Sequence, residues 1–372
     1  MNSKVKLLRF LSATLLLQGF IDGMAEDTLA QPAAAGANKF LGNITTSWYV
    51  RDDFMLYWNQ ITGENEHKWG TVEGTRGVYN WVSGDRVANF ARLNGIPWRF
   101  HALIWGSQYP RWMDDLSTAD QLTAVTRWMD QAAARYPDVQ MIDVVNEGLV
   151  GHAPPTTWIN ALGGTGATGW DWIINSFRMA RERWPNAILK YNDFNIVEWE
   201  HAIVGAINMM NILIANNTSI DALGVQAHDA FRLTPQQLQM NLDRLAALGL
   251  PIFITEFDIP REDDQQQLAI MRNLFPVMWN HPSVVGVTIW GYIVGSTWVT
   301  GTGLKHPDGR HRPALTWLLE YVRDNPNPRN NFPDLMRTGG GTCPPTTITP
   351  RARVNQGELQ QISTITVEAG AR

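Results

Sequence analysis

Runs of β-forming apolar residues alternate with longer amphipathic segments through most of the chain. These runs predict eight strands, at Phe40–Thr45, Glu66–Gly70, Trp98–Trp105, Met141–Glu147, Ile188–Phe194, Leu223–His228, Ile252–Ile259 and Val285–Gly291. Strand and helix units that alternate at this length predict a parallel sheet, and eight of them predict an α/β fold closed into a (β/α)8 TIM barrel. A doubly wound open sheet is the competing interpretation, although no glycine-rich phosphate turn follows an early strand.

Two of the intervening helices have recognisable ends. Thr118 and Gln121 have the spacing of a capping box ahead of a helix over Leu122–Ala134. Pro235 is expected to open another helix, and Gly249 to close it. Both helices fit the alternation of strands and helices.

The first 25 residues resemble a secretory signal. Lys4, Lys6 and Arg9 precede an apolar stretch over Leu11–Phe20, and small residues follow it. We therefore expect residues 1–25 to be removed and the protein to be secreted, into the medium or the periplasm. No later segment reaches the ~20 apolar residues of a membrane-spanning helix, so no membrane partner is expected.

The composition changes after the last predicted helix. The barrel is expected to span residues 26–337, with a Gly- and Pro-rich linker over 338–350. Residues 351–372 are either the start of a truncated second module or a disordered tail, and both interpretations stay open. Cys343 is the only cysteine, so no internal disulfide and no thiolate metal site are expected.

Charge and tryptophan content narrow the range of partners. A net charge of −5 and a pI near 5.9 supply no basic surface for nucleic acid. The 17 tryptophans offer flat apolar faces with a polar N–H, which suit sugar rings, and about half are expected in the core. A monomer that binds a polysaccharide or oligosaccharide is the expectation.

Two strands end in a glutamate, which is unusual for an apolar core element. Glu147 ends Asp143-Val144-Val145-Asn146-Glu147, and Glu256 stands in Ile254-Thr255-Glu256-Phe257-Asp258. Parallel barrels place their catalytic groups at the carboxyl ends of the strands. Paired carboxylates on separate strands are the groups that glycoside hydrolysis uses.

The other predicted strand ends are also rich in polar and aromatic side chains. Those singled out are Glu64, Asn65, Lys68, His101, Trp105, Gln226, His228, Trp290 and Trp298. Together with the two glutamates they resemble glycoside hydrolase family 10, the xylanase family, from Phe40 to Val322. The resemblance implies a retaining endo-1,4-β-xylanase, which the signal segment makes a secreted one. This chemistry needs no cofactor because the chain supplies both carboxylates, and no His-x-x-x-His spacing suggests a metal.

The resemblance also implies a role for each residue. Glu147 would be the general acid/base and Glu256 the nucleophile, with Asn146 bonding the sugar 2-hydroxyl. His228 would hold the nucleophile, with Asp258 behind it. The remaining residues would bind sugar: Gln226, His101 and Trp105 at the cleaved position, Glu64, Asn65 and Lys68 at the next sugar outward, and Trp290 and Trp298 as an aromatic floor and wall.

Some positions depart from the family pattern. Gly106 stands where the family has a histidine, and Val294 where it has an aspartate. Both changes affect the expected substrate shape rather than the catalytic pair. The Gly-rich segment over 148–169 adds Trp158 and Trp170, which we expect near the leaving group.

Other interpretations of the same residues remain. Trp105 and Trp290 can be core aromatics, and Lys68 can be a surface ion-pair partner. A retaining β-glycosidase acting on another β-linked glycan has the same catalytic pair. A sugar-binding protein without catalysis is the alternative from a different class, although both glutamates are present.

Overall fold

The computed structural model describes residues 31–335, in which the strands form a closed parallel barrel. The strands are β1 (Phe40–Ile44), β2 (Gln60–Thr62), β3 (Trp98–Phe100), β4 (Ile104–Trp105), β5 (Met141–Asn146), β6 (Ile188–Asp193), β7 (Ala222–Val225), β8 (Ile252–Phe257) and β9 (Val284–Ile289). They pair in the order β3-β2-β1-β9-β8-β7-β6-β5-β4, and β3 also pairs with β5. Because β3 and β4 are two parts of one barrel strand, the ring has eight strands, as predicted.

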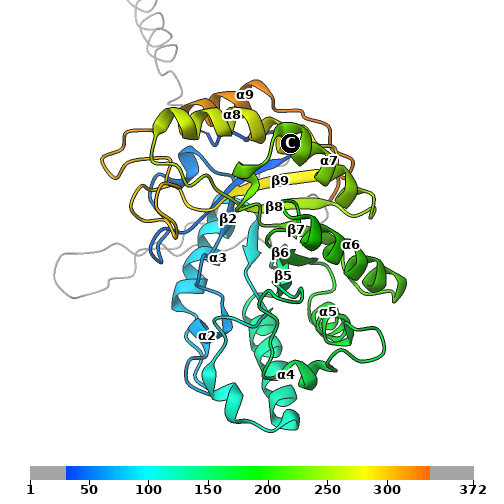
Figure 1. Ribbon diagram of the computed structural model, residues 1–372. Helices are drawn as coiled ribbons and strands as arrows, with labels where there is room; N and C mark the ends of the chain where they lie inside the picture. Colours follow the sequence, from blue (N-terminus) through cyan, green and yellow to red (C-terminus); the bar gives the residue numbers. More distant parts are fainter. Residues whose placement is uncertain (1–30, 336–372) are drawn as a thin grey trace, which may run out of the picture.

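Helices surround the barrel and connect successive strands (Figure 1). They are α2 (Trp69–Val72), α3 (Val82–Asn94), α4 (Thr118–Arg135), α5 (Asp171–Arg183), α6 (Glu200–Ala215), α7 (Pro235–Ala246), α8 (Asp264–Asn280) and α9 (Pro313–Asp324). Short 3-10 turns add η1 (Phe54–Leu56), η2 (Arg111–Asp115), η3 (Ile159–Leu162) and η4 (Ala230–Arg232). The predicted TIM barrel is confirmed.

The second strand was predicted in the wrong place. The segment Glu66–Gly70 forms no strand, and Gln60–Thr62 pairs with β1 and β3 instead. Glu66 and His67 are buried all the same, and the His67 ring packs against Trp98 and Phe100. Glu66 to Trp69 are buried in succession, and a short buried segment of this kind is not distinguished from a strand by sequence periodicity.

Two further local predictions need correction. The third strand is interrupted at residues 101–103, where the Leu103 N–H donates to the carbonyl oxygen of Asp143 at 3.0 Å. The cap of α4 is Ser117, whose hydroxyl accepts the Asp120 N–H at 3.2 Å. Gln121 is buried and its amide donates to the Met113 carbonyl, so it makes no capping box with Thr118.

The predicted ends of α7 fit the structure. Pro235 is its first residue, and Thr234 and Gln237 form a capping box around it. The helix ends at Ala246, and Gly249 follows with a positive φ of 77°. Glycine adopts that left-handed conformation without the steric penalty of a side chain.

The interior of the barrel has an apolar layer at one end and a charged layer above it. The apolar layer consists of Phe40, Met141, Ile188, Ala222, Phe253 and Val285 near the strand starts, with Phe332 and Leu335 packed against it. Higher up, Asp143 lies 3.2 Å from Arg99 and 3.0 Å from Lys190, and all three side chains are buried. Ion pairs in this position need several partners to offset desolvation.

Several predictions fall outside the described residues. These are the signal segment at 1–25, the linker at 338–350, the tail at 351–372 and the state of Cys343. Over residues 31–335, no helix combines the length and apolar character that a membrane crossing requires.

Candidate active site

A cleft of about 770 Å³ opens at the carboxyl ends of the barrel strands. The predicted site residues that line it are Glu64, Asn65, Lys68, His101, Trp105, Glu147, Gln226, His228, Glu256, Asp258, Trp290 and Trp298. They come from segments spread over more than 230 positions of sequence, between Glu64 and Trp298. Closure of the barrel brings them together, because parallel strands end at the same face.

Glu147 directly follows β5, with its backbone in the left-handed region at φ 56°. Its N–H donates to the Asn192 carbonyl at 2.8 Å, and its own carbonyl accepts the Ala153 N–H at 2.9 Å. These bonds hold a conformation that is uncommon for a residue with a side chain. The carboxylate accepts the Trp105 indole N–H at 2.8 Å and the Gln226 amide at 3.0 Å, which fixes its direction.

The two glutamates have opposite pKa shifts. Burial raises the pKa of Glu147, and the charge of Glu256 adds to this, while hydrogen bonds from Gln226 and Trp105 oppose it. Burial would also raise the pKa of Glu256, but the hydrogen bond from His228 and nearby positive charges lower it to about 2. Glu256 is therefore ionised at neutral pH, whereas the surroundings of Glu147 favour its protonated form more than water would.

His228 connects Glu256 to Asp258. Its Nε2 lies 3.3 Å from Glu256 Oε2, and its Nδ1 lies 3.1 Å from Asp258 Oδ2. Burial would lower the pKa of His228, but the charges and hydrogen bonds of Asp258 and Glu256 raise it to about 10. Trp298 donates its indole N–H to Asp258 at 2.6 Å and lies with its ring 4.6 Å from the imidazole. The charged imidazole thus lies between the Glu256 and Asp258 carboxylates, with one ring nitrogen facing each of them.

Two buried amides join the glutamates from below. Asn192 donates Nδ2 to Glu256 Oε1 and to Asn146 Oδ1, each at 2.8 Å, while Asn146 donates to Glu147 Oε1 at 3.1 Å. Asn192 occupies the space that a Cβ at Gly224 would fill, with its Oδ1 2.4 Å from that point. Asn146 is 0% exposed and lies below the cleft surface, so its expected contact with a sugar 2-hydroxyl stays a prediction.

Sequence reasoning missed the role of Asn192. Asn192 stands two residues before the end of the predicted strand Ile188–Phe194, and a polar side chain near a strand end is the same signal that marked the glutamates. Its contact with Glu256 depends on the order of strands in the closed barrel, which the pattern of one strand does not reveal.

A second polar group lies on the side of the cleft near β2. Lys68 Nζ donates to Asn65 Oδ1 at 2.8 Å and to Gln108 Oε1 at 2.7 Å, and it lies 4.8 Å from the Trp105 ring centroid. Burial lowers the pKa of Lys68, while the negative charges of the surrounding carboxylates partly offset this effect. Burial also raises the pKa of Glu64. Gln108 was not among the predicted site residues, although it lines the cleft.

The floor of the cleft rests on the charged layer in the barrel. His101 Nδ1 lies 2.8 Å from Asp143 Oδ2, and the His101 ring packs edge-on against Trp290 at 5.5 Å. Trp290 is 5% exposed, with the Arg99 guanidinium 5.6 Å from its centroid. Trp298 is 55% exposed and stands at the rim. The two tryptophans therefore differ: one belongs to the floor, and the other projects from the wall.

The donor groups of the described residues do not assemble a metal centre. Over residues 31–335, no three His, Cys, Asp or Glu side chains lie in positions that could hold a metal ion. The His101 and His228 imidazoles instead bond to carboxylates of the protein.

Comparisons with known proteins agree with this arrangement. The family model described as glycosyl hydrolase family 10 matches residues 24–321. The chain belongs to glycosyl hydrolase family 10.

Related family 10 proteins include endo-1,4-beta-xylanase B of Cellvibrio japonicus, which is 46% identical over 284 residues. The match covers 76% of this chain and 46% of that protein, so this chain spans about half the length of that relative. An endo-1,4-beta-xylanase of Agaricus bisporus is 33% identical over 65% of this chain and 74% of its own length. The crystal structure of xylanase 10B from Thermotoga petrophila RKU-1 in complex with xylobiose matches with a TM-score of 0.70 and 26% identity, over 79% of this chain and 97% of that one.

Trp158 and Trp170 do not lie where they were expected, beside the leaving group. Trp158 is fully buried and packs edge-on against Trp69 at 5.5 Å, so it belongs to the core rather than to the leaving-group side. Trp170 is the N-terminal flanking residue of α5 and is also packed against the core. Neither lines the cleft.

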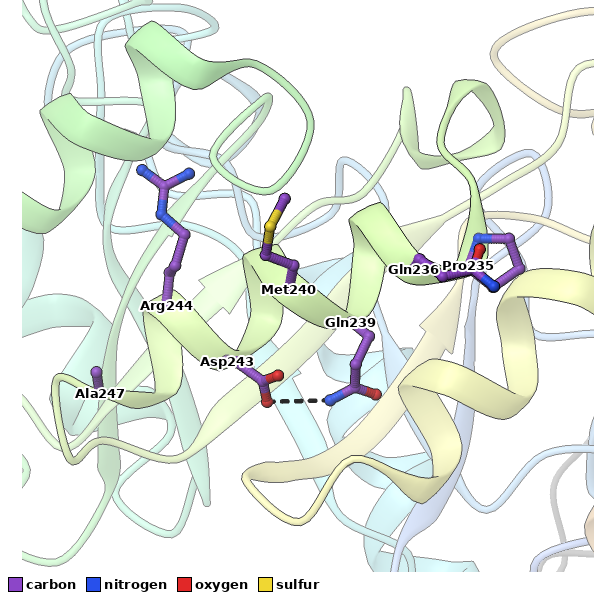
Figure 2. A pocket seen from close by; sticks show the side chains of 7 residues that line it. All are labelled: Pro235, Gln236, Gln239, Met240, Asp243, Arg244 and Ala247. Atoms are coloured by element: carbon purple, nitrogen blue, oxygen red, sulfur yellow. Dashed lines mark hydrogen bonds between the residues drawn. The ribbon is translucent and has the colours of Figure 1, made fainter.

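A separate surface hollow of about 720 Å³ lies along the outer face of α7 (Figure 2). Its charged side chains already have partners: Asp243 accepts from Gln239 at 3.0 Å, and Arg244 bonds to Glu200 at 2.7 Å. Figure 2 shows Gln239 and Asp243 joined on one side of the helix, with Met240 and Arg244 pointing to the other. No pair of catalytic groups converges there, which leaves the barrel cleft as the candidate active site of this family 10 chain.

Proposed function

We propose that the protein is a secreted, retaining endo-1,4-β-xylanase that hydrolyses the xylan backbone by double displacement. One observation carries this proposal: two carboxylates share one cleft, with the pKa of Glu256 lowered to about 2 and that of Glu147 raised. Such divergent shifts support Glu256 as the nucleophile and Glu147 as the general acid. The alternative of sugar binding without catalysis does not account for the opposite pKa shifts of the two glutamates.

In the first step, an oxygen of Glu256 attacks the anomeric carbon. The bond from that carbon to the leaving oxygen breaks as Glu147 gives its proton to the oxygen, and a covalent glycosyl ester remains on Glu256. Esterification removes the negative charge of Glu256, so the pKa of Glu147 falls. Glu147 then takes a proton from water, and the resulting hydroxide attacks the anomeric carbon and releases Glu256.

The choice of xylan rests on the relatives. The Cellvibrio japonicus and Agaricus bisporus proteins carry the name endo-1,4-beta-xylanase, and the Thermotoga petrophila structure holds xylobiose. The Lys68 and Asn65 group supports the assignment, because it offers polar contacts to a sugar beyond the one cleaved. Binding energy from such remote contacts can drive distortion of the reacting ring.

The product profile on linear xylohexaose, with cellohexaose beside it, tests this function. Short xylo-oligomers from wild type, but from neither Glu256→Ala nor Glu147→Ala, are expected. Preferential cleavage of cellohexaose would replace xylan with another β-linked glycan. Binding of either substrate without products would favour the non-catalytic alternative.

Retention has its own test. Newly formed reducing ends should appear first as the β-anomer in time-resolved NMR, because two inversions restore the starting configuration. With Glu147→Ala and an aryl β-xyloside, whose phenolate leaves without a proton from Glu147, azide should replace water in the second step and yield a β-glycosyl azide, since an anion needs no base. An initial α-anomer would contradict double displacement.

Export is a separate part of the proposal. It is supported by the sequence of residues 1–25, with Lys4, Lys6 and Arg9 ahead of the apolar stretch. Expression of the full chain in a bacterial host, followed by mass determination of the protein in periplasm and medium, is the test. A mature species that starts near Glu26 is expected, and an uncut chain held in the cytoplasm would contradict it.

A further inference from the structure

Two arginines stack on one phenylalanine at a rim of the cleft that the mechanism does not use. The Cζ atom of Arg232 lies 4.8 Å from the Phe231 ring centroid, and that of Arg261 lies 4.6 Å from the same point. Phe231 and Arg232 belong to η4, after β7, while Arg261 follows β8. Phe231, Arg232 and the neighbouring Pro260 line the cleft.

The charge of the cleft makes this rim distinctive. Five carboxylates line the cleft, against Lys68, Arg232 and the His228 imidazole, which already bonds to Glu256 and Asp258. Lys68 already donates to Asn65 and Gln108. An anionic substrate group would therefore be repelled along most of the cleft and attracted near Arg232.

Not all of the positive charge at the rim is neutralised. Arg232 pairs with Asp229 through Nε at 2.9 Å, and its side chain is 58% exposed. Arg261 donates Nη1 to the Pro260 carbonyl at 2.9 Å, and no carboxylate within residues 31–335 forms an ion pair with its guanidinium. A guanidinium stacked on a ring uses its face, so N–H groups at its edge remain for a planar anion.

The backbone beneath Arg261 is held in place. The buried Arg312 donates to the Arg261 carbonyl at 2.7 Å and to the Glu262 carbonyl at 2.9 Å, and it pairs with Asp264 at 2.6 Å. The Arg261 N–H bonds to the Ile259 carbonyl at 2.9 Å. A rigid support of this kind lowers the entropy lost when a side chain binds a ligand.

We propose that Arg232 and Arg261 bind the carboxylate of an acidic sugar side group, of the hexuronic acid class, on the glycan being cut. The inference rests on the proposed function. The loops after β7 and β8 carry the pair, whereas the β2 loop carries Lys68, and β1 and β9 lie between β2 and β8 in the barrel.

The test compares one polymer in two forms: a glucuronoxylan, and the same glucuronoxylan with its carboxyl groups reduced to alcohols. The measured quantity is kcat/KM on the acidic form divided by kcat/KM on the reduced form. This ratio is expected to be roughly fivefold higher for wild type than for Arg232→Gln/Arg261→Gln. Arg261→Lys, which keeps the charge but not the planar donors, should lie between the two. About 0.5 M NaCl should narrow the difference between the variants.

The matched control is Arg111→Gln. Arg111 also stacks on a ring, with Cζ 4.7 Å from the Tyr109 centroid, but neither Arg111 nor Tyr109 lines the cleft, whereas the Phe231 ring under Arg261 does. Its ratio should equal that of wild type. An unchanged ratio in the double variant, or an equal change in the Arg111 variant, would overturn the proposal.

A binding measurement keeps this inference separate from the proposed activity. In a Glu256→Ala background, Kd for acidic and carboxyl-reduced oligosaccharides is measured with and without the two arginine substitutions. The arginine substitutions should weaken binding of the acidic oligosaccharide only. If wild type cuts no linear xylohexaose, the proposed function fails, while the Kd ratio still decides the role of the arginines.

Discussion

The Gly106 backbone N–H donates to the Ala153 carbonyl oxygen at 2.7 Å. The Ala153 N–H donates in turn to the Glu147 carbonyl at 2.9 Å, so the segment after Glu147 folds back against the chain next to Trp105. A Cβ at Gly106 would lie 2.0 Å from the Pro154 carbonyl oxygen. The main chain thus occupies the place where the family pattern has a histidine side chain.

Gly106→Ala is expected to destabilise the protein by about 1–3 kcal/mol, because backbone atoms cannot move aside as a flexible side chain can. The melting temperature should fall by a few degrees, and kcat should fall with it as Glu147 is displaced. Gly205→Ala is the matched control: a Cβ there meets no atom closer than 3.8 Å, and alanine favours the helix. A Gly106→Ala protein as stable as wild type would show that the backbone at residues 153–154 shifts to accommodate the added methyl group.

Trp105→Phe should move the basic limb of the pH–rate profile to higher pH. The indole N–H bonds to the Glu147 carboxylate at 2.8 Å and favours its ionised form, so removing the bond raises the pKa of Glu147. Glu147 must be protonated for the first step, and activity then persists to higher pH. The measurement is kcat/KM against pH on xylohexaose, and a limb displaced to lower pH would contradict the assigned role.

His228→Ala should move the acidic limb of the same profile to higher pH. His228 lowers the pKa of Glu256 through a hydrogen bond and a positive charge, against the effect of burial. Without His228, Glu256 takes up a proton at a higher pH, and kcat/KM should fall more at pH 5 than at pH 7. Asp258→Asn should act in the same direction but less strongly, because it leaves the imidazole in place and removes the main charge that keeps it protonated. An equal loss at every pH would indicate a purely steric role for His228.

Asp143→Asn should cost about 3–5 kcal/mol of unfolding free energy at pH 7, because it leaves the buried Lys190 and Arg99 charges without their anion. The pKa of Asp143 is far below its usual range despite burial, owing to those two cations and His101. Its stabilising contribution is therefore present above the unfolded pKa of about 4 and is lost as the pH falls.

Urea unfolding at pH 7 and at pH 3 measures this difference, which should shrink at the lower pH. Asp138→Asn is the control, because Asp138 pairs with Arg92 at the surface and its side chain is 48% exposed. The control should change stability by no more than about 1 kcal/mol. An equal effect of the two substitutions would contradict the buried network.

The sequence by itself determined the fold class and most strand positions. The predicted bounds of β5, β6 and β8 agree with the structure to within two residues, because strands buried on both faces consist mostly of apolar residues. It also marked Glu147 and Glu256, since a carboxylate at the end of such a run has no place in a core. By contrast, the second strand was predicted at Glu66–Gly70, a segment that contains the buried His67, whereas Gln60–Thr62 forms β2.

Only the tertiary structure decided which side chains meet. The amide bridge from Asn146 through Asn192 to Glu256 spans three strands, and its geometry depends on the register of the closed barrel. The burial of Trp158 and the stacking of Arg232 and Arg261 on Phe231 likewise depend on loops far apart in sequence. Periodicity reports the environment of one segment, whereas contacts between segments arise when the chain closes on itself.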